Sequence, residues 1–162
     1  MSGSIHGTST RRGLLKGAFA GLAASVIGQL GLVFPGIARA AWPSDAFAAK
    51  TPDAALHSLF DGKPIVPTDR IHIDLPALAE DGSIVPLTVS ADLEGVESIS
   101  VIAGKNPVPL IARFDFDTDA VLPEISTRIK LAETSMVTVV ALAGGRLYSA
   151  RRDVKVTHGG CG

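Results

Sequence analysis

The sequence predicts an all-β protein: an antiparallel β-sandwich with a short N-terminal helix and a flexible C-terminal arm of glycines and one cysteine. Beyond Pro67, apolar residues recur at every second position in about seven short runs separated by Gly, Pro and Asp. Before Pro67 the apolar spacing is helical, and after Thr157 the chain closes on Gly159-Gly160-Cys161-Gly162. These three observations divide the chain beyond its first forty residues into an N-terminal helical segment, a β-sandwich and a C-terminal arm.

The first forty residues have the features of a twin-arginine export signal. Arg11 and Arg12 stand directly before a weakly apolar run over 17–38, and Ala38-Arg39-Ala40 provides small residues around a cleavage point. We therefore expect residues 1–40 to direct export to the periplasm, with cleavage after Ala40. The alternative is a membrane anchor, since about 20 apolar residues can span a bilayer. The many glycines of the run and Pro35 argue against a stable one.

Charge and cysteine usage exclude several classes of protein. The export segment holds four of the 15 basic residues and none of the 16 acidic ones, so the mature chain has a net charge of −5. No stretch interleaves basic with aromatic residues, so we expect no nucleic-acid partner. A single cysteine also excludes a disulfide framework.

The segment 41–66 is predicted to be largely helical, over residues 44–60. Thr51-Pro52-Asp53 supplies an N-cap residue, a proline at the first helical position and an acid in the first turn. An apolar stripe at helical spacing follows, made of Ala55, Leu56, Leu59 and Phe60. Asp61-Gly62 is expected to end the helix.

Residues 67–157 are predicted to form the sandwich. The expected strands cover 71–75, 85–90, 99–103, 110–116, 125–131, 135–143 and 146–157. Turn sequences such as Asp81-Gly82 and Gly144-Gly145 separate them. Short strands at this regular spacing favour an immunoglobulin-like arrangement.

The tail, residues 158–162, carries the candidate functional group, the thiol of Cys161. Gly159, Gly160 and Gly162 add no side chains beside it and give the backbone freedom, so we expect a mobile arm. His158 is the one nearby side chain that could assist the thiol. Two ligands, His158 and Cys161, make a poor metal site, so we expect neither a metal nor a cofactor. No pattern of catalytic residues or phosphate-binding loop is present, which favours a protein that is not itself an enzyme.

Several stretches resemble one family, the SoxY sulfur carriers of thiosulfate oxidation. The stretches are Asn106-Pro107-Val108-Pro109-Leu110, Ser126-Thr127-Arg128-Ile129-Lys130-Leu131-Ala132, Leu147-Tyr148-Ser149-Ala150, and the closing run from Val154 to Gly162. The family tail usually has two glycines after the cysteine, whereas this chain has one.

The resemblance implies a carrier that holds sulfur intermediates covalently on Cys161. It implies a heterodimer with a SoxZ-like subunit, and as further partners a c-type cytochrome, a sulfate-releasing hydrolase and a sulfane dehydrogenase. Two other functions remain open from the residues alone. One is a structural module whose cysteine forms intermolecular disulfides, and the other is a periplasmic protein that delivers a metal or cofactor.

Overall fold

The computed structural model describes residues 42–117 and 123–160. The predicted export signal, with Arg11, Arg12 and Ala40, lies outside the described residues, as do Cys161 and Gly162. Among the described residues, no helix has the length and apolar character needed to cross a membrane.

The N-terminal segment forms two helices, α2 (Ser44–Ala48) and α3 (Pro52–Phe60), rather than one continuous helical stretch. The break covers residues 49–51, where Ala49 leaves the helical conformation (ψ 143°) and Thr51 is extended (φ −130°, ψ 149°), as expected of a residue before proline. Its side-chain oxygen accepts a hydrogen bond of 3.2 Å from the Ala54 N–H, which confirms the predicted cap. Asp61, in the left-handed conformation, ends α3 as expected.

Within residues 42–117 and 123–160, nine strands form two sheets, which confirms the predicted β-sandwich. Their bounds are β1 Ile65–Pro67, β2 Ile71–Asp74, β3 Leu78–Asp81, β4 Val85–Ala91, β5 Val96–Ala103, β6 Leu110–Asp115, β7 Glu124–Ile129, β8 Ser135–Ala143 and β9 Arg146–His158. The larger sheet has the order β1-β9-β8-β5-β6, with β3 also paired to β9. The smaller sheet has the order β2-β4-β7.

Two of these strands, β1 and β3, were not among the seven predicted, and both pair in parallel with β9. β1 lies beside residues 147–149 of β9, and β3 lies beside its last residues, with Asp81 opposite His158. All other pairings are antiparallel, as predicted. Strand pairing thus begins at Ile65, inside the segment expected to be helical.

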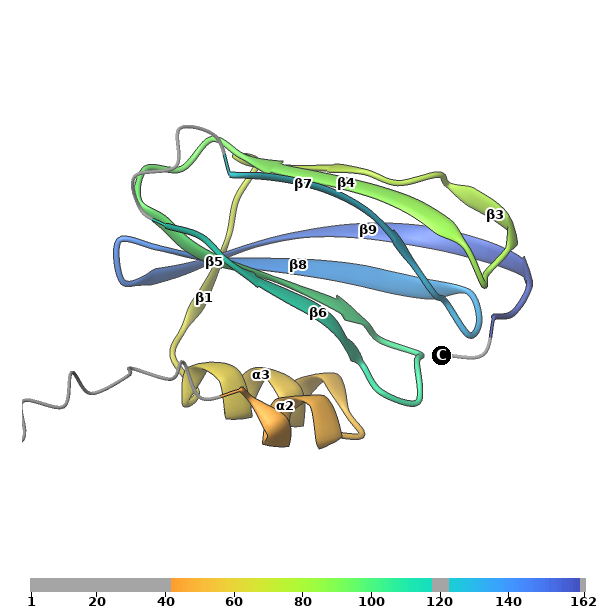
Figure 1. Ribbon diagram of the computed structural model, residues 1–162, viewed down its shortest axis with the longest axis horizontal. Coiled ribbons are helices and arrows are strands. Elements are labelled where there is room, and N and C mark those ends of the chain that lie inside the picture. Colours follow the sequence, from red (N-terminus) through yellow and green to blue (C-terminus); the bar gives the residue numbers. More distant parts are fainter. Residues whose placement is uncertain (1–41, 118–122, 161–162) are drawn as a thin grey trace, which may run out of the picture. The chain divides into compact units, whose positions relative to one another are not determined.

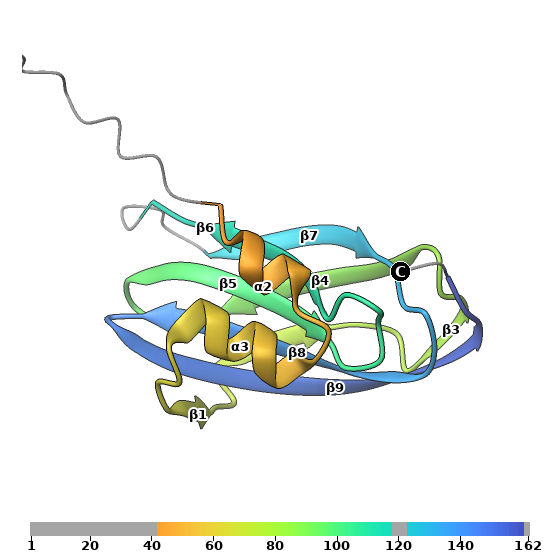
Figure 2. The same cartoon turned by 90° about the horizontal axis from the view of Figure 1, so that it is seen from below.

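The main core lies between the sheets, and a second apolar cluster lies under the helices. Alternate residues of β4, β5 and β8 fill the main core, where Val85, Val101 and Val139 have no exposed surface. In the second cluster, Ala55 and Phe60 of α3 pack against Ile102 and Val140 of the larger sheet. Figure 1 accordingly shows three layers, with the smaller sheet above the larger one and the helices below it. Figure 2 shows the helices crossing the outer face of the larger sheet.

Candidate functional site

Strand β9 brings the chain to the candidate site at its C-terminal end. It has 13 residues, the most of any described strand, and pairs with β8 from Arg146 to Val154, with β1 near its start and with β3 at its end. Gly159 and Gly160 follow, and Gly160 is buried. The last described residue therefore lies against the body, directly before Cys161.

Two backbone hydrogen bonds join the tail to two loops, and a third joins the loops to each other. The Gly82 N–H, in the turn between β3 and β4, donates to the His158 oxygen at 2.7 Å. The Leu131 N–H, between β7 and β8, donates to the Gly82 oxygen at 2.7 Å. The Gly160 N–H then donates to the Leu131 oxygen at 2.9 Å. The tail, the β3–β4 turn and the β7–β8 connection are thus linked in a closed series.

The glycines at this site are required by close contact. A Cβ on Gly159 would collide with the Ala132 carbonyl oxygen, and a Cβ on Gly160 would lie 2.5 Å from the backbone nitrogen of Ser83. A Cβ on Gly82 would collide with the Leu131 carbonyl oxygen. None of the three has a positive φ, in contrast to Gly144 and Gly145 in the β8–β9 turn. Absence of a side chain, rather than an unusual backbone conformation, explains glycine at 82, 159 and 160.

Asn106 fixes the β7–β8 connection from the loop between β5 and β6. Its Nδ2 donates to the Lys130 oxygen at 2.8 Å, and its Oδ1 accepts from the Ala132 N–H at 2.9 Å. The side chain therefore brackets Leu131, whose carbonyl oxygen holds the tail. Asn106 is only 7% exposed, so bulk water has little access to replace either of its two hydrogen bonds.

His158 and Asp81 lie opposite each other where β3 meets β9. The His158 ring donates from Nδ1 to the Glu80 oxygen at 3.3 Å, so it is held against β3. Hydrogen bonds from the side chain and the backbone N–H of Ser83 lower the pKa of Asp81 below its ordinary value, and nearby His158 lowers it slightly further. The structure thus places His158 within the sheet rather than at the start of a free arm.

Three of the stretches singled out in the sequence meet at this site: the one at Asn106, the one at Leu131 and the tail. Sequence reasoning missed the roles of Asn106 and Gly82, because Asn-Pro and Asp-Gly pairs indicate only turns. The fourth stretch, beginning at Leu147, lies at the other end of β9 and pairs with β1.

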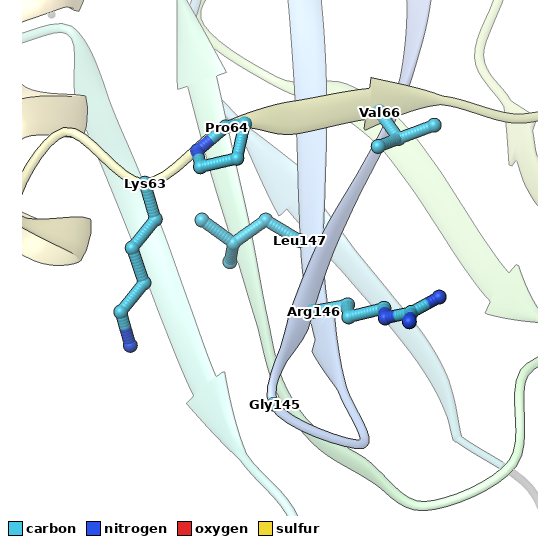
Figure 3. Close-up of a pocket in the computed structure, with 6 residues that line it drawn as sticks. All are labelled: Lys63, Pro64, Val66, Gly145, Arg146 and Leu147. Atoms are coloured by element: carbon cyan, nitrogen blue, oxygen red, sulfur yellow. The ribbon is translucent and has the colours of Figure 1, made fainter.

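A pocket at that other end is not part of the candidate site. It is lined by Lys63, Pro64, Val66, Gly145, Arg146 and Leu147. Figure 3 shows the side chains of Lys63 and Arg146 pointing away from each other, so their charges do not converge on one ligand. Because β9 rises about 3.3 Å per residue, the pocket lies roughly 35–40 Å from His158. Among the described residues, no group of three His, Cys, Asp or Glu side chains could hold a metal ion.

The fold and the site define a β-sandwich protein. Its last described strand continues into two glycines that pack against the body, and in the sequence these glycines come directly before the cysteine. The family described as "Sulfur oxidation protein SoxY" matches residues 56–161, which include both sheets and end on Cys161. The chain belongs to the SoxY family.

One solved structure agrees with this assignment. The sulfur carrier protein SoxY from Chlorobium limicola f thiosulfatophilum is 40% identical, with a TM-score of 0.60, over 65% of this chain and 94% of that chain. A superoxide reductase (neelaredoxin) from Ignicoccus hospitalis is 16% identical, with a TM-score of 0.50, over 57% of this chain and 94% of that one. At that identity the second likeness shows the fold alone. A search of curated proteins found no match.

Proposed function

We propose that this chain carries sulfur intermediates covalently on Cys161 and presents them to the enzymes of a thiosulfate-oxidising system. The observation that carries the proposal is the placement of the family's terminal cysteine one residue after Gly160, whose N–H is bonded to the body. The similar protein from Chlorobium limicola f thiosulfatophilum is a sulfur carrier, which supports the same role here.

The proposed chemistry begins at the Cys161 thiolate. In the first step the thiolate sulfur bonds to the outer sulfur of thiosulfate, giving a cysteine S-thiosulfonate and releasing two electrons to a c-type cytochrome. Water then attacks the terminal sulfone on a hydrolase, which releases sulfate and two protons and leaves a persulfide on Cys161. A sulfane dehydrogenase then oxidises the persulfide sulfur with oxygen from three waters, which gives a sulfonate on the Cys161 sulfur and releases six protons and six electrons, and the electrons pass to the c-type cytochrome. A second hydrolysis releases this group as sulfate and restores the thiolate.

The chain itself supplies attachment and positioning rather than catalysis in this proposal. Cys161 has no Lys or Arg next to it in the sequence that would stabilise the thiolate. The partner enzymes would therefore activate the thiol and provide the metal or haem chemistry. The body would pair with a SoxZ-like subunit, and the whole would act in the periplasm after export by the twin-arginine route.

A substitution at Cys161 tests the proposal. Cys161→Ser should abolish thiosulfate-dependent electron transfer in a mixture of the partner proteins, while the unfolding midpoint and partner binding stay unchanged. A matched control is Ser58→Cys, which adds an exposed thiol on α3 and leaves Cys161 in place. Undiminished turnover by Cys161→Ser would contradict the proposal. Loss of only covalent dimers would favour the structural-module alternative.

A further inference from the structure

The root of the tail rests in a small backbone slot, which we call the arm seat. Its walls are Gly82 and Ser83 on one side and Leu131 and Ala132 on the other. Gly160 is the residue buried in it. Every contact that would exclude a Cβ here is with backbone atoms or with the half-buried Val156 side chain, which packs against the core, so the slot has no long flexible side chain that could move aside.

Gly82 shows that the slot is a specific structure rather than a by-product of a glycine-rich arm. It lies outside the arm, 77 residues before Gly159 in the chain. A Cβ on Gly82 would nevertheless lie 2.8 Å from the Gly160 nitrogen and collide with the Leu131 oxygen. A turn with an ordinary φ does not itself require glycine. The need for glycine at 82 therefore comes from the seated tail and from the wall at Leu131.

Asn106 supplies the other half of the arrangement. The Leu131 oxygen is the acceptor for the Gly160 N–H, and Asn106 bonds the residues on both sides of Leu131. Truncating Asn106 would free this connection to shift, and the acceptor would shift with it.

We propose that Gly82 and Asn106 are positioning residues that give the carrier arm two working lengths, seated and released. This inference rests on the proposed carrier function. When the tail is seated, the body holds it as far as Gly160. When the tail is released, the body holds it only as far as His158, whose oxygen still accepts from the Gly82 N–H. Release adds two residues of reach, about 7 Å. Release breaks one backbone hydrogen bond, the one from the Gly160 N–H to the Leu131 oxygen. The seated form is therefore favoured over the released form by a factor of about 2–12. Entry into a deep enzyme site would use the long form.

Hydrogen exchange of the Gly160 amide tests the seat directly. The sample is the reduced mature chain, and exchange is followed by NMR in the parent, in Gly159→Ala and in Gly104→Ala. Gly104 is the matched control, because a Cβ there would meet its nearest neighbour at an ordinary 3.6 Å. We expect slowed exchange at Gly160 in the parent and in Gly104→Ala, with the slowing lost in Gly159→Ala. Free exchange of Gly160 in the parent would overturn the seat.

Reach is tested by comparing two reactions of Cys161. Diamide oxidation joins two Cys161 thiols into a disulfide, with two hydrogens passing to the diamide, and requires the tails of two bodies to meet. Alkylation by iodoacetamide requires only an accessible thiol. We expect Gly159→Ala to raise the ratio of the disulfide rate to the alkylation rate by about 2–12-fold, the factor set by one hydrogen bond. An unchanged ratio would overturn the two-length arm.

Gly82→Ala and Asn106→Ala should change both readouts in the same direction as Gly159→Ala. The amides of Val101 and Val139, deep in the core, show whether each variant remains folded. A folded Asn106→Ala chain that keeps a protected Gly160 amide would remove Asn106 from the proposal. These readouts need no partner protein. A seated tail on a chain that loads no sulfur would therefore contradict the carrier function and leave the seat standing.

Discussion

Removal of the Asn106 side chain is the substitution whose effect follows most directly from the structure. Asn106→Ala leaves the Ala132 N–H without its acceptor and the Lys130 oxygen without its donor. An unsatisfied buried backbone group costs about 1–3 kcal/mol. Both groups are only partly buried, and the space left by the side chain can admit water. We therefore expect the free energy of unfolding to fall by about 2–4 kcal/mol.

Urea unfolding of the mature chain, followed by tryptophan fluorescence and circular dichroism, measures this loss. The midpoint should fall while the slope stays unchanged, since the surface exposed on unfolding is nearly the same. Lys105→Ala is the control, because its side chain is exposed and its backbone N–H keeps its bond to Ser135. We expect the control to differ from the parent by less than about 0.5 kcal/mol. A loss below about 0.5 kcal/mol for Asn106→Ala would refute the bracketing role of the side chain.

Three further predictions concern single side chains. Ser100 has a buried hydroxyl with no partner in the described structure, so Ser100→Ala should leave the unfolding free energy within about 0.5 kcal/mol or raise it; a loss above about 1 kcal/mol would contradict this. Thr51→Ala removes the cap of α3 and should cost about 0.5–2 kcal/mol, with faster amide exchange at Ala54; unchanged exchange there would speak against the cap. The lowered pKa of Asp81 means that its contribution to stability is complete above the ordinary value of 3.8 and is lost as the pH falls through the folded-state pKa. Ser83→Ala should raise that pKa in an NMR titration, and an unmoved pKa would show that the Ser83 hydroxyl does not lower it.

Most of the sandwich could be predicted because apolar residues recur at every second position of most strands, and this pattern is local. β5 and β8 are buried on both faces and were recognised as short, mostly apolar runs. β3 could not be found in this way, because only Ala79 of its four residues is buried. β1 has three residues and none that is fully buried. Both exist because β9 offers a free edge, which is a property of the tertiary structure.

The chemistry of the candidate site stays a prediction from the sequence, and the architecture around it was missed. The thiol and its glycines stand together in the sequence, so Cys161 could be identified at once. Asn106, Gly82 and Leu131 are far apart in the chain, and only the pairing of β3 with β9 and the β7–β8 connection brings them together. Glycine at 159 and 160 was interpreted as a source of flexibility. The structure gives a second reason for it, since both residues pass too close to other backbone atoms to carry a side chain.

The mass of the intact mature chain after incubation with thiosulfate and the partner proteins is the most direct test of the account. We predict a product heavier than the thiol form by a thiosulfonate group, located on Cys161 by fragmentation and removed by a reducing thiol. Cys161→Ser treated in the same way should keep its original mass. An unmodified Cys161 in a mixture that consumes thiosulfate would contradict the carrier function.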